Sequence, residues 1–301
     1  MVAHPFDEAT TAEPVPIERL ARDSELVRDL YSRCDYAGAL ALLVQLIPAL
    51  HGTGGHDYRA VLGLMIPVYG AAMGSLLNVG YPAHALLAAE RCGEAADQLG
   101  DPAALAVAAA NRARVSAYTG AYRPARSVCD RAANALERHL AAPAALDLLG
   151  FLHLARSLHC AGTHDLATAQ DHITEAATIA ARTGESGAWD MAWGPRNVAL
   201  WQMALQLDTG RAGESIETAR TIKVDELPAQ RQVYFYMDLA RGLADVDRGH
   251  DAVRMLLNAD RVGPQHARSS TAARETAKSL LRKGEGGSAL RGLCERMGVA
   301  A

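Results

Sequence analysis

The stretch Gly120-Ala-Tyr-Arg-Pro-Ala125 decides the fold, because variants of it recur along the chain. Each variant follows one apolar helical stretch and precedes another. Its first residue, usually glycine, suits the left-handed conformation that ends a helix, and the small residue five positions later lets the next helix pack closely. The variants begin at Cys34, Gly80, Gly120, Gly162, Gly210 and, with a looser match, Asp247.

The spacing of these turns predicts a repeat architecture. Their first residues lie 46, 40, 42, 48 and 37 positions apart, a period typical of stacked helix pairs. Breakers such as Gly100-Asp-Pro102 and Leu227-Pro228 divide each period into two helices. No run of alternating β-branched residues is long enough for a strand. We therefore expect an all-α, right-handed superhelix of about six helix pairs with a C-terminal cap.

The chain divides on this basis into three segments. We expect a flexible N-terminal tail over residues 1–15, a repeat solenoid over 16–262 and a C-terminal helical cap over 263–301. The cap carries more arginine and lysine than acid, which we interpret as the solvated end that a solenoid requires.

Composition limits the classes of function. Half of the residues are hydrophobic and the net charge is −4, so a packed core is expected and direct nucleic-acid binding is not. Five cysteines without a Cys-x-x-Cys pair argue against a disulfide framework and for a reducing cytoplasm. The N-terminus lacks the pattern of a signal peptide. The most apolar stretch, Val61 to Val79, is broken by glycine, proline and polar residues, so no membrane span is expected.

Two family resemblances follow from these motifs. Gly120-x-Tyr122-x-x-Ala125 with Ala132 resembles the tetratricopeptide pattern. More specifically, residues 17–301 resemble the sensor region of actinobacterial helix-turn-helix transcriptional regulators of the repressor type, through segments such as Gly80-Tyr-Pro-Ala-His-Ala85 and Trp193-Gly-Pro-Arg-Asn197. Too few residues precede the first predicted helix to form a helix-turn-helix domain. The resemblance therefore implies a stand-alone sensor, scaffold or partner protein without its own DNA-reading module.

The resemblance to tetratricopeptide repeats also implies where a ligand would bind. In such stacks the first helix of each pair lines the concave groove. Groove positions are therefore expected about 9 and 6 residues before the first residue of each turn, and also 13, 10, 3 and 2 residues before it. Asparagine can donate to and accept from a peptide backbone, and arginine can hold a carboxylate with two hydrogen bonds. The ligand-binding residues predicted from this register are Asn111, Arg114, Tyr118, His153, Arg156, Asn197 and Trp201. The alternative is that polar residues are there because the groove faces water.

The three tryptophans form a second candidate feature, since all lie between Trp189 and Trp201. Trp193 and Trp201 are predicted to make an aromatic wall for an apolar or cyclic ligand. The alternative is that they fill a gap where the solenoid changes pitch. Tyr234-Phe-Tyr236 is interpreted as core or interface.

We find no sequence signature of catalysis, and we predict no catalytic residue, metal ligand or cofactor. A phosphate-binding loop, a His-Glu-x-x-His motif and a nucleophile elbow are all missing from the sequence. His153, His159 and His164 lie near Cys160, but spacings of six and five residues do not suit metal ligation from one helix face. Ordinary core or groove histidines are the simpler interpretation.

Taken together, these patterns predict a non-enzymatic regulatory sensor in the cytoplasm. It would bind a short peptide or small signalling molecule in the groove and be linked to transcription through another protein, such as a DNA-binding regulator. A homodimer is left open. The first alternative is a ligand-free protein-interaction scaffold, and an enzyme whose chemistry is hidden in the groove is a more distant one.

Overall fold

The structure is a computed structural model that describes residues 15–53, 58–141, 144–187, 189 and 191–299. Within these ranges the chain forms α-helices and short 3-10 helices, and no β-strand. The tail predicted over residues 1–15 lies outside the described residues except for Val15. The α-helices are α1 (Ile17–Ser32), α2 (Tyr36–Gly52), α3 (Tyr58–Asn78), α4 (Pro82–Leu99), α5 (Pro102–Tyr118), α6 (Tyr122–Leu136), α7 (Ala145–Gly162), α8 (Leu166–Thr183), α9 (Pro195–Asp208), α10 (Ala212–Arg220), α11 (Ala229–Asp245), α12 (Gly249–Val262), α13 (Pro264–Ser269), α14 (Thr271–Arg282) and α15 (Gly287–Met297).

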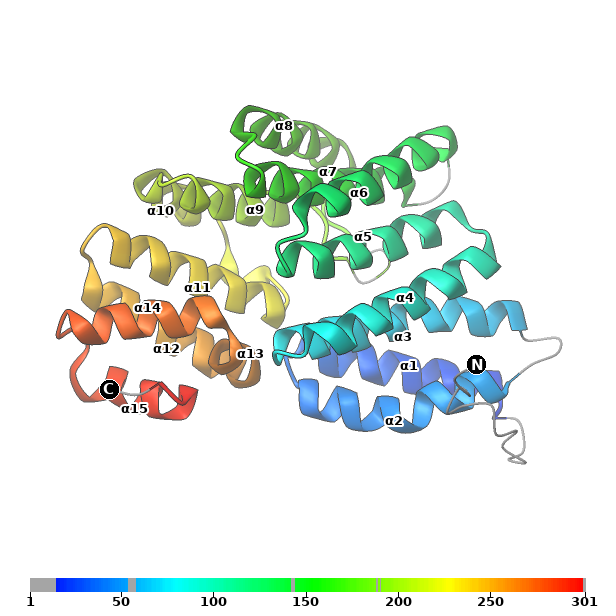
Figure 1. Cartoon of the computed structure of the whole chain (residues 1–301), viewed down its shortest axis with the longest axis horizontal. Helices are drawn as coiled ribbons and strands as arrows, with labels where there is room; N and C mark the ends of the chain where they lie inside the picture. Colours follow the sequence, from blue (N-terminus) through cyan, green and yellow to red (C-terminus); the bar gives the residue numbers. More distant parts are fainter. Residues whose placement is uncertain (1–14, 54–57, 142–143, 188, 190, 300–301) are drawn as a thin grey trace.

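Six antiparallel helix pairs follow one another, from α1 with α2 to α11 with α12, as the recurring turn predicts (Figure 1). In each turn one residue takes a left-handed backbone conformation, with φ of 91° at Gly80 and 81° at Gly120. The next residue donates its N–H to a carbonyl five positions back, as Tyr81 does to Leu76, which closes the helix end. The remaining left-handed turn residues are Cys34, His164, Gly210 and Asp247.

The fourth turn differs from the sequence-based register by two residues. The left-handed residue there is His164, with φ of 64°, and not Gly162, which is still helical. The small residue at the helix contact shifts with it, because Ala169 is fully buried whereas Ala167 is exposed. Two residues rotate a helix position by about 200°, so this shift changes which α7 side chains face the groove.

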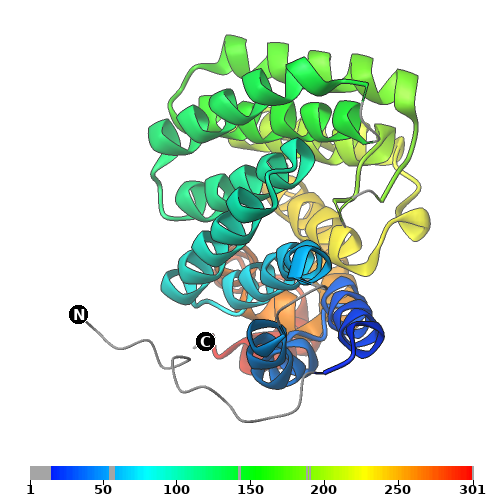
Figure 2. The same cartoon turned by 90° about the vertical axis from the view of Figure 1, so that its right-hand side faces the viewer.

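The helix stack turns far enough to bring its two ends together. Figure 1 and Figure 2 show the first helices beside α13. The backbone N–H of Ala37 donates to Gln265 Oε1 at 2.9 Å, and Gln265 Nε2 donates to Asp35 Oδ1 at 3.1 Å. The backbone of Gly263 also lies against Cys34, so closely that a Cβ there would need Cys34 to shift. The superhelix is therefore closed by contacts between residues about 230 positions apart.

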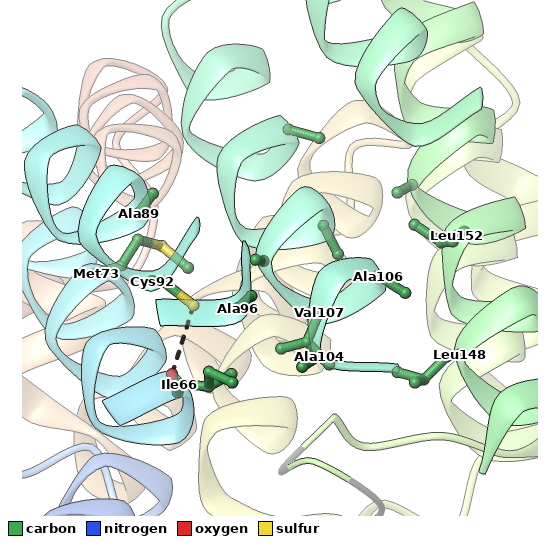
Figure 3. Packing of buried hydrophobic residues seen from close by; sticks show 14 of the residues in the cluster. Ile66, Met73, Ala89, Cys92, Ala96, Ala104, Ala106, Val107, Leu148 and Leu152 are labelled. Atoms are coloured by element: carbon green, nitrogen blue, oxygen red, sulfur yellow. Dashed lines mark hydrogen bonds between the residues drawn. The ribbon is translucent and has the colours of Figure 1, made fainter. Parts of the chain in front are cut away.

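The core consists of small side chains that allow close helix approach, with larger ones in the remaining gaps. Figure 3 shows this packing for α3, α4, α5 and α7, where Cys92 Sγ donates to the Ile66 carbonyl at 3.6 Å. By length and composition α3 could cross a membrane, but 67% of its most apolar window is buried inside the stack. Its apolar character is that of a core helix.

Beyond α12 the chain adds three helices. Two of them, α14 and α15, agree closely with the helices that the sequence pattern predicts over residues 270–283 and 287–297. The six-residue α13 was not predicted, and it begins at Pro264, directly after Gly263 ends α12. A proline is well tolerated at the first helical position, so the Gly-Pro pair ends one helix and starts the next. This short helix is the element that reaches the N-terminal repeats.

Candidate functional site

A cavity of about 750 Å³ lies on the concave side of the superhelix. Nearly all of its wall comes from the first helices of the pairs, α1, α3, α5, α7, α9 and α11, together with α13, the start of α14 and the segment before α9. Only Tyr122 comes from a second helix of a pair. The leading helices therefore share one inner wall, as the repeat pattern predicts.

Four of the predicted ligand-binding residues line this cavity: Asn111, Arg114, Tyr118 and Trp201. They come from α5 and α9. Asn111 Nδ2 lies 3.7 Å from Cys92 Sγ, and Tyr118 is 53% exposed at the end of its helix. The structure therefore brings the third and fifth leading helices to one site.

His153 and Arg156 lie elsewhere, between α7 and its neighbours. His153 Nδ1 is 3.0 Å from His172 Nδ1 on α8, and Arg156 Nε is 2.8 Å from Asp130 Oδ1 on α6. The sequence pattern predicted these two residues to face the groove because they lie nine and six positions before Gly162. Counted from His164, the groove positions are Ala155 and Leu158, and both line the cavity. The two-residue shift thus explains why His153 and Arg156 are not there. Burial, with added repulsion from His172 and Arg156, lowers the pKa of His153 to about 4.

Trp193 and Asn197 are also outside the cavity wall. Trp193 is 2% exposed, its Nε1 donates to Thr183 Oγ1 at 2.8 Å, and its indole occupies the space beside Gly150. Backbone hydrogen bonds with Ser186 hold it in the α8–α9 connection. Asn197 is 2% exposed in the first turn of α9. Trp193 therefore has a packing role here, which is the alternative that the sequence left open.

One end of the cavity is polar, and Arg114 is its centre. Its Nη1 donates to Tyr31 Oη at 3.2 Å, and its Nη2 donates to Asn78 Oδ1 at 3.3 Å and to Tyr234 Oη at 3.0 Å. Gln230 Nε2 also donates to Tyr31 Oη, at 2.7 Å. The network therefore joins α1, α3, α5 and α11 across the closure of the superhelix.

Charge and burial set the titration of this polar end. Burial alone would raise the pKa of the Tyr31 phenol, but Arg114 and the hydrogen bond from Gln230 hold it below its ordinary value. Burial, together with the charges of Arg114 and Arg231, lowers the pKa of His266 to about 3. His266 is therefore neutral at any pH near 7.

The opposite wall is apolar and aromatic. Phe151 and Trp201 meet edge to face, with ring centroids 6.1 Å apart, and Trp189 and Met191 lie on the same cavity wall. This is the part of the tryptophan cluster that faces the cavity. A cavity with one hydrogen-bonding end and one aromatic wall can orient a small amphipathic ligand.

Several cavity residues were not predicted from the sequence. Asn78 lies two positions before Gly80, and Tyr234 lies thirteen before Asp247, so the repeat register contains the signal for both. Arg231 and Gln230 lie further up α11, in its first turn. His266 had no such signal, because it belongs to α13, which the repeat does not include.

The chain resembles solved helical-repeat structures. One is a "Rap Protein Complexed with Competence and Sporulation Factor", with a TM-score of 0.57 at 11% identity over 94% of this chain and 88% of that one. The fold is tetratricopeptide-like. A second similar chain is the TPR2AB domain of yeast Sti1 in complex with pHSP90, with a TM-score of 0.33 at 15% identity over 78% of this chain and 99% of that one. No protein-family profile and no curated protein sequence matches the chain.

The cavity wall carries hydrogen-bonding, charged and apolar side chains, and none of the five cysteines lines it. All five cysteines are buried, and burial raises the pKa of Cys34 and of Cys92 to about 11, which leaves both as unreactive thiols. Among the described residues, no three His, Cys, Asp or Glu side chains gather to hold a metal ion.

Proposed function

We propose that this chain is a regulatory sensor that binds a short peptide or small signalling molecule in the cavity on the concave side of its superhelix. The observation that carries the proposal is the cavity itself. At about 750 Å³, it is within the size range of ligand sites and combines a few convergent polar groups with an aromatic wall.

Its position at the closure of the superhelix supports a role in signalling. Tyr31 of α1 and Gln230 of α11 meet at 2.7 Å on its wall, and Arg114 contacts the same hydroxyl. A ligand that forms hydrogen bonds with these groups either replaces the contacts that close the superhelix or strengthens them. It therefore binds a closed and an opened superhelix with different affinity. Such a difference is what a ligand needs in order to shift a conformational equilibrium.

Two further elements of the proposal depend on the family resemblance. The first is a link to transcription through a DNA-binding regulator, because the regulators that the sequence resembles carry such a module. The second is a cytoplasmic location, which agrees with the five unpaired cysteines. The similar Rap structure contains a bound factor, and we transfer from it only the expectation that a fold of this kind binds a ligand. Catalysis is not part of the proposal.

Ligand-dependent unfolding tests the proposal. Peptide and small-molecule fractions from cells that produce the protein should raise the melting temperature of the wild type. The Trp201→Ala variant should lose much of this rise in melting temperature. The Tyr81→Phe variant should keep it, because Tyr81 is exposed, directly precedes α4 and does not line the cavity. If no fraction stabilises the wild type, the ligand-free interaction scaffold becomes the better description.

A further inference from the structure

Three arginines line the cavity, Arg28, Arg114 and Arg231. The charges of Arg114 and Arg231 are close enough to act on each other. Arg114 donates only to oxygens of Tyr31, Asn78 and Tyr234. These are phenol and amide oxygens, so they satisfy the N–H groups without supplying a carboxylate charge. Among the described residues, the hydrogen-bond partners of Arg114 are therefore all neutral side chains.

Arg231 has still fewer partners. Its Nε is buried without a hydrogen-bond partner, and no described residue forms an ion pair or hydrogen bond with its side chain. Burial, together with the nearby charge of Arg114, lowers the pKa of Arg231. Two like charges that are partly removed from water destabilise each other and the folded protein.

The one described acid on the cavity wall does not neutralise this pair. Asp238 lies two turns along α11 from Arg231. Burial raises its pKa to about 6, opposed by Arg241, and Asp208 adds to the rise. Arg241 in turn pairs with Asp208 at 2.7 Å. Asp238 therefore belongs to a separate group of charges on the α9 side.

We propose that the cavity binds an amphipathic anion, whose carboxylate or phosphate group lies between Arg114 and Arg231 and whose apolar body lies against Phe151, Trp201 and Met191. This rests on the proposed function and specifies the chemistry of its ligand. Arginine holds such anions with paired N–H groups, and no described residue accepts a hydrogen bond from the Arg231 side chain. The aromatic wall on α7 and α9 faces the same cavity and accepts the rest of the molecule.

The first test uses simple anions on the purified full chain. At matched ionic strength, acetate or inorganic phosphate should raise the melting temperature above its value in chloride. Octanoate or octyl phosphate should bind at least tenfold more tightly than neutral octanamide, because only the anions are attracted by the positive charges of the two guanidinium groups. Stronger binding of octanoate than octyl phosphate identifies a carboxylate ligand, and the reverse identifies a phosphate.

The second test removes one charge. Arg231→Gln should reduce octanoate and octyl phosphate affinity at least tenfold and leave octanamide affinity unchanged. Without ligand its melting temperature should equal or exceed that of the wild type, because the repulsion is gone. Arg220→Gln is the matched control, since Arg220 is exposed on α10 and pairs only with Glu217. If Arg231→Gln folds poorly, Arg231→Met provides the same test without a polar amide.

The results separate this inference from the proposed function. Equal binding of octanoate and octanamide, or unchanged anion affinity in Arg231→Gln, overturns the anion site while leaving a ligand cavity. The absence of any anion-specific stabilisation overturns it as well. The proposed function fails instead if anions stabilise the protein but no cellular fraction binds.

Discussion

Tyr36 and His266, which are 230 residues apart in the sequence, are joined by a hydrogen bond of 3.0 Å between Oη and Nδ1. Asn78 Nδ2 donates to the same Oη at 2.9 Å. A neutral imidazole with its proton on Nε2 accepts the Tyr36 hydroxyl proton at Nδ1, and the other tautomer donates from Nδ1 to Tyr36 Oη. This buried chain of three side chains joins the first two repeats to α13 beside the cavity.

Removing the Tyr36 hydroxyl should loosen the closure of the superhelix. Tyr36→Phe leaves Asn78 and His266 each with one buried polar atom unpaired, which costs about 1–3 kcal/mol. Denaturant unfolding measures this loss. Tyr81→Phe is the control, because Tyr81 is 56% exposed and its hydroxyl joins no part of this network. A stability equal to that of the wild type would mean that the closure contributes nothing.

Stability should fall as the pH drops below about 6.5. The pKa of His266 is lowered to about 3 and that of His159 to about 4, each from an ordinary value of 6.5. Between these values the unfolded chain binds protons that the folded chain does not, so the free energy of unfolding decreases with falling pH. Each histidine contributes up to about 1.4 kcal/mol per pH unit.

Urea unfolding at pH 7.5 and pH 5.0 checks this dependence. His266→Asn keeps an acceptor for Tyr36 but cannot titrate, so its loss of stability on acidification should be smaller than that of the wild type by about 1 kcal/mol or more. The same pH dependence in both proteins would show that His266 is already protonated in the folded state.

Trp193 and Trp201 should differ in their roles. Trp193 is packed on Gly150, so Trp193→Ala should cost about 3–5 kcal/mol of stability. Gly150→Ala should also destabilise, because its new methyl group overlaps the indole. Trp201→Ala should weaken ligand binding with a smaller loss of stability, since Trp201 lies on the cavity wall. Thermal melts and ligand titrations of the three variants test this, and a larger loss of stability for Trp201→Ala would reverse the assignment.

The register of the fourth turn gives a prediction that separates the structure from the sequence pattern. Ala169 is fully buried and Ala167 is exposed. Ala169→Arg should unfold or severely destabilise the protein, because a charged side chain cannot enter a helix contact without a large desolvation penalty. Ala167→Arg should change stability by less than about 0.5 kcal/mol. The opposite result in circular-dichroism melts would restore Gly162 as the turn residue.

The sequence was sufficient for the fold because the same turn recurs six times, and each copy carries its own helix-ending and packing signal. The sequence predicted the position of the site less completely. The fourth turn lies two residues later than the pattern predicts, so His153 and Arg156 lie on another face of α7, whereas Asn111 and Arg114 line the cavity. Local patterns also contain no information on closure, so the contacts of His266 with Tyr36 could not be inferred.

The polar end of the cavity shows the same limit. Arg231 is unremarkable in the sequence of α11, and its significance comes from lying beside Arg114, which is on α5. Only the three-dimensional arrangement brings these two charges together. Two buried like charges lower the stability of the fold, and local sequence patterns do not predict that two such charges will meet.

The most direct test of the central claim is native mass spectrometry of the protein after incubation with the low-molecular-mass fraction of an extract of its own cells. The wild type should retain a small-molecule or peptide mass. Ala204→Phe, which fills the cavity from α9, should lose that mass, and Ala181→Phe, an exposed change on α8, should keep it. Retention of the same mass by Ala204→Phe, with undiminished affinity, would contradict the assignment of this cavity as the ligand site.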